Sequence, residues 1–215
     1  MNKIDIPKYS LAEELISSIS HGIGALLGIA ALVLSVVFSN KPVAIVSSAI
    51  YGASLIILYT ISCLYHSFSP NIKAKKVFRV LDHDSIYLLI FGTYMPYLLV
   101  TLGGSKGWIL WGILLFLSIL GITLNSINLE KFKNISLISY ILMGWIVLFA
   151  FNDIRISLGY MGTLYLILGG IMYTIGALFY KIGKKVKYMH SLFHFFVLAG
   201  SIFHFSSIFL YVIRW

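Results

Sequence analysis

Seven long apolar segments follow one another along the chain, and they constrain its fold more than any other feature. A helix needs about 20 apolar residues to cross the hydrocarbon core of a bilayer, because each residue adds about 1.5 Å. Lipid offers no hydrogen-bond partner to an exposed backbone group, so we expect each segment to be helical. The segments lie at approximately 16–38, 43–65, 82–102, 107–128, 134–152, 159–181 and 188–212.

The composition agrees with a chain that lies almost entirely within a membrane. Hydrophobic residues make up 60% of its 215 residues and charged residues 11%, whereas soluble domains average about 45–50% apolar and about 25% charged. The connections are short, so we expect one domain over residues 1–215, an all-α bundle of seven transmembrane helices. No cleavable signal peptide is expected, because the first apolar run is too long for one. The lone cysteine, Cys63, excludes an internal disulfide.

The basic residues indicate an orientation in the membrane rather than a nucleic-acid surface. The formal net charge is +9, but the lysines and arginines occupy short loops, where the positive-inside rule places them. With the N-terminus inside, 12 basic residues are inner and 4 are outer, which accounts for all 16. We therefore predict a cytoplasmic N-terminus, an outer C-terminus and no nucleic-acid partner. The inner set is Lys3, Lys8, Lys73, Lys75, Lys76, Arg79, Lys131, Lys133, Lys181, Lys184, Lys185 and Lys187, and the outer set is Lys41, Lys106, Arg155 and Arg214.

Polar residues of three predicted helices meet at one depth in this topology. Ser62 and His66 end the second segment, and Asp82 begins the third. His190 and His194 begin the seventh segment. Ser62 and His66 are four residues apart, as are the two histidines of the seventh segment, so each pair shares a helix face. All five residues are therefore expected near the cytoplasmic side.

This set has the composition of a catalytic zinc site. Two histidines at i and i+4 can direct both imidazoles at one ion, and His66 supplies a third ligand from another helix. Three nitrogens leave a position for water, whose pKa zinc lowers to about 7. Asp82 is then predicted to orient that water or move its proton, and Ser62 to support the water or an oxyanion.

Each of these residues also has a structural interpretation. Histidines near an interface bond neighbouring helices; Asp82 is placed to cap a helix beginning there; and Ser62 can bond a carbonyl one turn back. His204 lies ten residues beyond His194, a rise of about 15 Å, so it cannot share the metal and either makes a buried contact or lines a cavity. His21 is a candidate proton relay or outer partner of the site, or a helix-packing residue.

Four blocks of the sequence resemble the signature blocks of a known family. These are EELISSISHGIG (13–24), SCLYHSF (62–68), LDHDSIYLLIFGTYMPYL (81–98) and MHSLFHFFVLAGSIFHF (189–205). They are similar to blocks of the hemolysin III family, the bacterial branch of the progestin and adiponectin receptor (PAQR) superfamily. The resemblance covers nearly the whole chain.

The resemblance implies a fold and a site. It implies seven helices, an inner N-terminus and a zinc ion near the cytoplasmic face. The three ligands would match His66, His190 and His194, the aspartate beside the metal water Asp82, and the serine of the first block Ser62. The superfamily is grouped with alkaline ceramidases as membrane hydrolases, which implies a lipid amide or ester substrate.

Three functions remain open at this stage. The first is a zinc-dependent lipid hydrolase, with membrane lipid as substrate or ligand and no required protein partner. The second is a non-enzymatic regulator or sensor of membrane state with structural zinc, and the third is a cytolytic protein. An ion pathway, motivated by His21 and His204, is disfavoured by the apolar middles of most segments. The bacterial inner (plasma) membrane is the expected location.

Overall fold

The computed structural model describes residues 4–183 and 185–213, and this part of the chain contains helices and no strands. Lys3, Lys184 and Arg214, counted above in the charge asymmetry, lie outside the described residues. Short π-helical segments follow α3 and α6, at Pro96–Leu102 and Phe209–Ile213, and a 3₁₀ segment, Ile146–Ala150, precedes α5. The α-helices are α1 (Leu11–Val37), α2 (Pro42–Ser67), α3 (Lys73–Met95), α4 (Gly104–Gly144), α5 (Phe151–Ile182) and α6 (Met189–Ile208).

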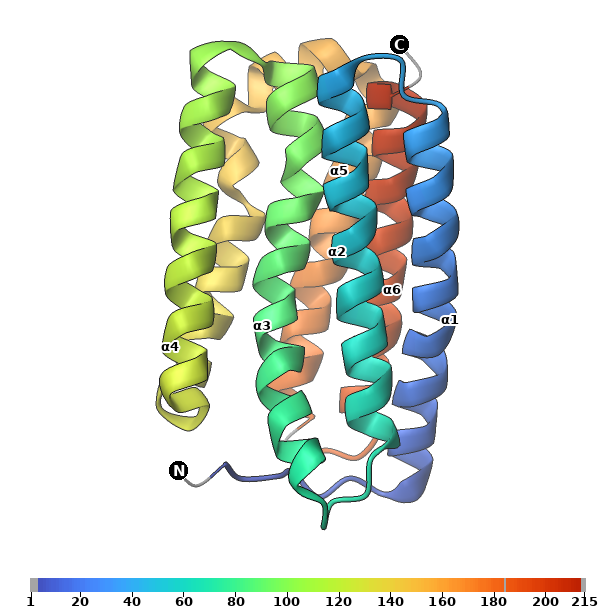
Figure 1. Cartoon of the computed structure of the whole chain (residues 1–215), viewed down its shortest axis with the longest axis vertical. Helices are drawn as coiled ribbons and strands as arrows, with labels where there is room; N and C mark the ends of the chain where they lie inside the picture. Colours follow the sequence, from blue (N-terminus) through green and yellow to red (C-terminus); the bar gives the residue numbers. More distant parts are fainter. Residues whose placement is uncertain (1–3, 184, 214–215) are drawn as a thin grey trace.

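Five helical stretches are long and apolar enough to cross a membrane. One of them, Gly104–Ile182, has 79 residues, and as a straight helix it would be about 120 Å long, several times the bilayer thickness. It is broken at Asn128, where the backbone is extended, and at Gly159, whose φ is 66°. Figure 1 shows the first part of α4 descending, its second part returning upward in yellow, and α5 descending again in orange. The prediction of an all-α membrane protein is confirmed.

Helix α1 turns its small and polar residues inward and most of its large apolar residues outward. The buried face of α1 consists of Glu13, Ser17, Ser20, His21, Gly24, Gly28, Ala31 and Ser35. Its leucines and isoleucines, including Leu26 and Ile19, are exposed. This is the reverse of a soluble helix and suits lipid, which solvates the apolar side chains while small residues allow close helix packing.

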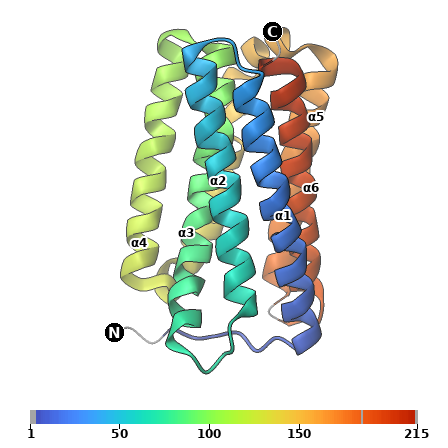
Figure 2. The same cartoon turned by 45° about the vertical axis from the view of Figure 1, so that its right-hand side comes forward.

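Close approach between α1 and its neighbours brings the polar residues together. A Cβ added at Gly24 of α1 would lie 2.6 Å from the ring of Tyr59 on α2, so this ring packs directly on the backbone of α1. Figure 2 shows α1 alongside both α2 and α6, and residues of α1 contact both helices. The polar face of α1 is therefore directed at the ends of α2 and α6 that carry the histidines.

The helix containing the third apolar segment begins at Lys73, earlier than the predicted span of 82–102. Its first turns carry basic residues that ion pairs bury: Lys75 with Glu14 at 2.6 Å and Arg79 with Glu130 at 2.7 Å. Asp82 consequently lies well inside α3, and its interpretation as a helix cap is wrong. At Pro96, whose ring disturbs the hydrogen bonds of a helix interior, the helix passes from α to π geometry.

Candidate metal centre

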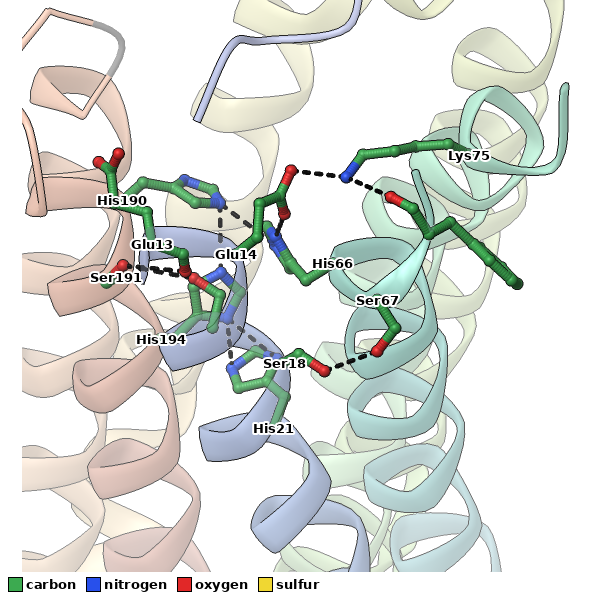
Figure 3. A network of polar contacts seen from close by, with 12 residues as sticks. Glu13, Glu14, Ser18, His21, His66, Ser67, Lys75, His190, Ser191 and His194 are labelled. Carbon is green, nitrogen blue, oxygen red and sulfur yellow. Dashed lines mark hydrogen bonds and ion pairs between the residues drawn. The ribbon is translucent and has the colours of Figure 1, made fainter. Parts of the chain in front are cut away.

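Three buried imidazoles converge where the end of α2 meets the beginning of α6. The residues are His66, His190 and His194, which are 3%, 5% and 1% exposed. The Nε2 atom of His190 lies 3.4 Å from that of His66 and 3.2 Å from that of His194. One ligand atom from each residue lies within 4.8 Å of the others, so the cluster could hold a metal ion. Figure 3 shows the three rings directed toward one another.

Local sequence explains this convergence. His190 and His194 are one helical turn apart, and both lie on the buried face of α6. His66 occupies the last turn of α2, on the face that also buries Ser62. Two helices are therefore enough to place three imidazoles at one point.

The spacing of the nitrogens fits zinc. Two ligands each about 2.0–2.1 Å from a tetrahedral ion are about 3.3 Å apart, close to the 3.2 and 3.4 Å between the Nε2 atoms. When the Nε2 atoms are all unprotonated, their lone pairs repel one another at this distance, and a cation between them removes that repulsion. The residues present therefore fit a zinc ion.

The outer nitrogens of two of the rings have partners of their own. The Nδ1 atom of His66 lies 2.6 Å from Oε2 of Glu14, whose other oxygen lies 2.6 Å from the ammonium of Lys75. The Nδ1 atom of His194 lies 2.9 Å from Nε2 of His21. A carboxylate on Nδ1 of His66 holds the proton there and leaves Nε2 free to bind a metal, as such partners do in metal sites.

The N-terminal segment covers the cluster from the cytoplasmic end predicted above. The ring of Tyr9 stacks on that of His190 with centroids 4.4 Å apart. The backbone NH of Asp5 donates to Glu130, just after the break in α4. Burial of the Tyr9 hydroxyl, together with the nearby Tyr180 phenol, raises its pKa above the ordinary value. Tyr9 is therefore a neutral ring over the site rather than a charged one.

Ser62 and Asp82 lie in a cavity beside the cluster. The cavity has a volume of about 130 Å³, and His21 and Phe193 also line it. The side chain of Ser62 lies next to the Asp82 carboxylate. Because His21 contacts His194, the cavity adjoins the histidine cluster.

His204 lines the same cavity at a distance from the cluster, as its spacing from His194 predicts. Its ring packs against Gly169, where a Cβ would lie 2.7 Å from the imidazole.

The sequence interpretation did not assign two residues that the structure places around the cluster, Glu14 and Lys75. A signal for Glu14 existed: it precedes His21 by seven residues, or two turns, so both lie on one face of α1. Lys75 gave no such signal, since it sits in a basic run that reads as a solvated loop.

The fold and the cluster together define an integral membrane protein with a buried histidine site. The sequence profile described as "Haemolysin-III related" matches residues 9–205, and the chain belongs to that family. It is 40% identical to "Hemolysin-3" of Bacillus cereus, covering 94% of this chain and 92% of that protein. It is 38% identical to the "Hemolysin-3 homolog" of Bacillus subtilis (strain 168), covering 96% and 97%.

A more distant similarity reaches outside bacteria. The chain is 26% identical to the human "Monocyte to macrophage differentiation factor" over 180 residues, covering 79% of this chain and 71% of that protein. This similarity supports the link to the receptor superfamily, and the family resemblance of the sequence blocks is confirmed.

Proposed function

We propose that this protein is a zinc-dependent hydrolase that cleaves an amide or ester bond of a membrane lipid. The observation that carries the proposal is the junction of two features. A zinc-fitting cluster of three buried imidazoles adjoins a cavity that a serine and a carboxylate line. Among the described residues, this is the group of three histidine, cysteine or carboxylate side chains that could hold a metal ion.

His66, His190 and His194 would hold the zinc ion. Bound there, zinc would polarise a lipid carbonyl and increase the acidity of water. Within the described part of the chain the cluster has three members, which suits a catalytic site better than the four-ligand closed arrangement of structural zinc.

The chain's own polar groups divide the remaining tasks. Asp82 would accept a proton from water at its carboxylate, and its place in the cavity beside Ser62 suits that role. The Ser62 hydroxyl would donate a hydrogen bond to the oxygen that gains charge during attack. Glu14 would hold the proton on Nδ1 of His66 and so keep the ligand nitrogen free.

The walls of the cavity suit a lipid chain. Away from Asp82 the lining includes Leu58, Ile90, Leu166 and Val197. Apolar walls recognise hydrocarbon by area, while a few polar groups fix its orientation. The partner we propose is therefore a membrane lipid that enters from the bilayer.

The proposed topology has seven crossings, with the N-terminus in the cytoplasm and the protein in the bacterial plasma membrane. The breaks at Asn128 and Gly159 divide the longest helical stretch near the predicted segment ends. Each of two ion pairs joins two loops that the predicted topology places on the same side of the membrane. Lys106 and Asp153 pair on the outer side, and Arg79 and Glu130 pair on the inner side. In Figure 1 the described ends of the chain lie at opposite ends of the bundle, as an odd number of crossings requires.

The experiment compares Asp82→Asn with Asp84→Asn in protein purified without chelators. Asp84 is two residues away on α3, but its carboxylate accepts from Ser126 on α4. Zinc is measured by elemental mass spectrometry, and hydrolysis with ceramide-type amides and glycerolipid esters. We expect both variants to keep zinc, and Asp82→Asn alone to lose about 10²- to 10⁴-fold in rate. Equal rates in the two variants would remove Asp82 from the mechanism.

Two other functions are outcomes of the same preparation. Stoichiometric zinc with no hydrolysis of any lipid would favour a membrane-state regulator with structural zinc. The name of the Bacillus cereus relative motivates a cytolytic test, in which added protein releases dye from liposomes. Leakage at protein levels that show no hydrolysis would favour that function.

A further inference from the structure

The cavity beside the histidine cluster has a second polar end, formed by Thr93 of α3 and His204 of α6. Both residues line the cavity and are 5% and 6% exposed. Neither the Thr93 hydroxyl nor Nδ1 of His204 has a hydrogen-bond partner among the described residues. Thr93 lies eleven residues beyond Asp82 on α3, and His204 ten beyond His194 on α6, so this end is about 15 Å from the cluster.

Neighbouring polar groups are paired within the protein. The Ser201 hydroxyl, one turn before His204, receives a hydrogen bond from Tyr59 at 2.6 Å and contacts the Tyr173 hydroxyl at 2.8 Å. The Tyr97 hydroxyl, one turn beyond Thr93, donates to the backbone carbonyl of His204 at 3.5 Å. Thr93 and His204 therefore differ from Tyr97 and Tyr173, which line the same cavity but have partners for their hydroxyls within the protein.

An unpaired buried polar atom costs about 1–3 kcal/mol, and two of them at one end of an apolar cavity are suited to a ligand. A neutral imidazole nitrogen and a threonine hydroxyl can each donate or accept. The acidic and basic residues of the lining are Asp82 and Lys133, and Asp82 lies three turns before Thr93 on α3. A charged ligand group at the far end would lack a counter-charge there, whereas a hydroxyl could pair with both residues.

We propose that Thr93 and His204 form a subsite for a hydroxyl group carried on the hydrocarbon chain of a lipid, about 15 Å from its polar head. The ligand class is thus an amphiphile with hydrogen-bonding groups at both ends of an apolar chain. This subsite deepens the proposed function by naming the lipid class. It rests on the proposed function only in assigning the polar head of the lipid to the end of the cavity near the histidine cluster. The binding itself requires no hydrolysis.

The test compares dodecanol with its diol, which carries a hydroxyl at each end of a chain of about this length. Neither compound has a bond to hydrolyse, so binding is measured apart from activity. Radiolabelled ligand is equilibrated with the protein in nanodiscs, and binding to empty nanodiscs is subtracted. Wild type is expected to bind the diol about tenfold more tightly than dodecanol, because the second hydroxyl of the diol forms hydrogen bonds in a buried site.

Three variants decide the outcome. Thr93→Val is isosteric and removes the hydroxyl alone, and His204→Leu removes the imidazole. Each is expected to reduce the preference for the diol at least threefold while zinc content stays at the wild-type level. An absent preference in wild type, or an unchanged one in either variant, overturns the subsite. His190→Ala, which removes a proposed zinc ligand, should keep the preference, so failure of the zinc site and failure of this subsite are distinguishable.

Discussion

Glu14 offers the sharpest test of the metal centre, because it touches a proposed ligand without being one. Its carboxylate accepts from Nδ1 of His66 at 2.6 Å and pairs with Lys75 at 2.6 Å. The Glu14 side chain is only 12% exposed, so water and salt screen these contacts little. Glu14→Gln keeps the size of the side chain and removes its charge.

The expected effect is a loss of zinc affinity of about 10- to 100-fold, the usual cost of removing a partner of a metal-ligating histidine. This corresponds to about 1.4–2.7 kcal/mol of binding free energy, in keeping with about 1.5–3 kcal/mol for a hydrogen bond to a charged group. The physical reason is that the neutral amide no longer fixes the proton on Nδ1, so His66 spends part of its time with Nε2 protonated.

The assay is competition for zinc between purified protein and a fluorescent chelator of known affinity. Glu13→Gln is the matched control, since Glu13 precedes Glu14 on α1 but bonds the backbone NH groups of Ser10 and Tyr188. We expect the control to bind zinc as wild type does. Equal affinity in Glu14→Gln and wild type would refute the reasoning.

A second variant separates metal affinity from folding stability. Glu14→Gln leaves Lys75, which is 0% exposed, as an unpaired buried charge, and breaking a buried pair costs about 3–5 kcal/mol. The double variant Glu14→Gln/Lys75→Met removes that charge and should recover thermal stability. The double variant should unfold at a higher temperature than Glu14→Gln. If the loss of zinc affinity comes from the freed Nδ1 of His66, the double variant should still bind zinc as weakly as Glu14→Gln does.

Three further predictions concern the site and the packing. His190→Ala should purify without zinc, whereas His204→Ala should retain it; unchanged zinc in His190→Ala, by elemental mass spectrometry, would mean that the site is misassigned. Chelator added to wild type should lower the melting temperature, because folding loses the stabilisation that bound zinc provides. That stabilisation is about 2.7 kcal/mol where free zinc had been 100 times Kd. An unchanged melting curve would contradict a bound metal. Gly121→Ala should destabilise the protein by about 1–3 kcal/mol, because its Cβ would overlap the buried ring of Tyr87. Gly112→Ala, with nothing within 4 Å, should not; equal melting temperatures of the two variants would refute this packing.

Sequence alone was enough for the fold class because lipid leaves a long apolar segment few alternatives. The reliance on hydropathy also explains why the sequence analysis missed the beginning of α3. Hydropathy assigned the run around Lys75 and Arg79 to a loop, whereas α3 begins at Lys73. In the structure, ion pairs with Glu14 of α1 and Glu130 of α4 hold the beginning of α3 in the bundle. Those partners are 61 and 51 residues away, so no local pattern reports them.

The site divides along the same line between local and tertiary information. The i, i+4 spacing of His190 and His194 is a property of one helix, and a shared depth with His66 follows from counting crossings, so this meeting could be expected. The sequence could not predict which nitrogen of His66 faces the other two histidines, because the carboxylate of Glu14 on α1 determines the orientation of the ring. Since only a ring with Nε2 unprotonated and inward can bind zinc alongside the other two, α1 decides whether the histidines of α2 and α6 act as a metal site or as a polar packing cluster.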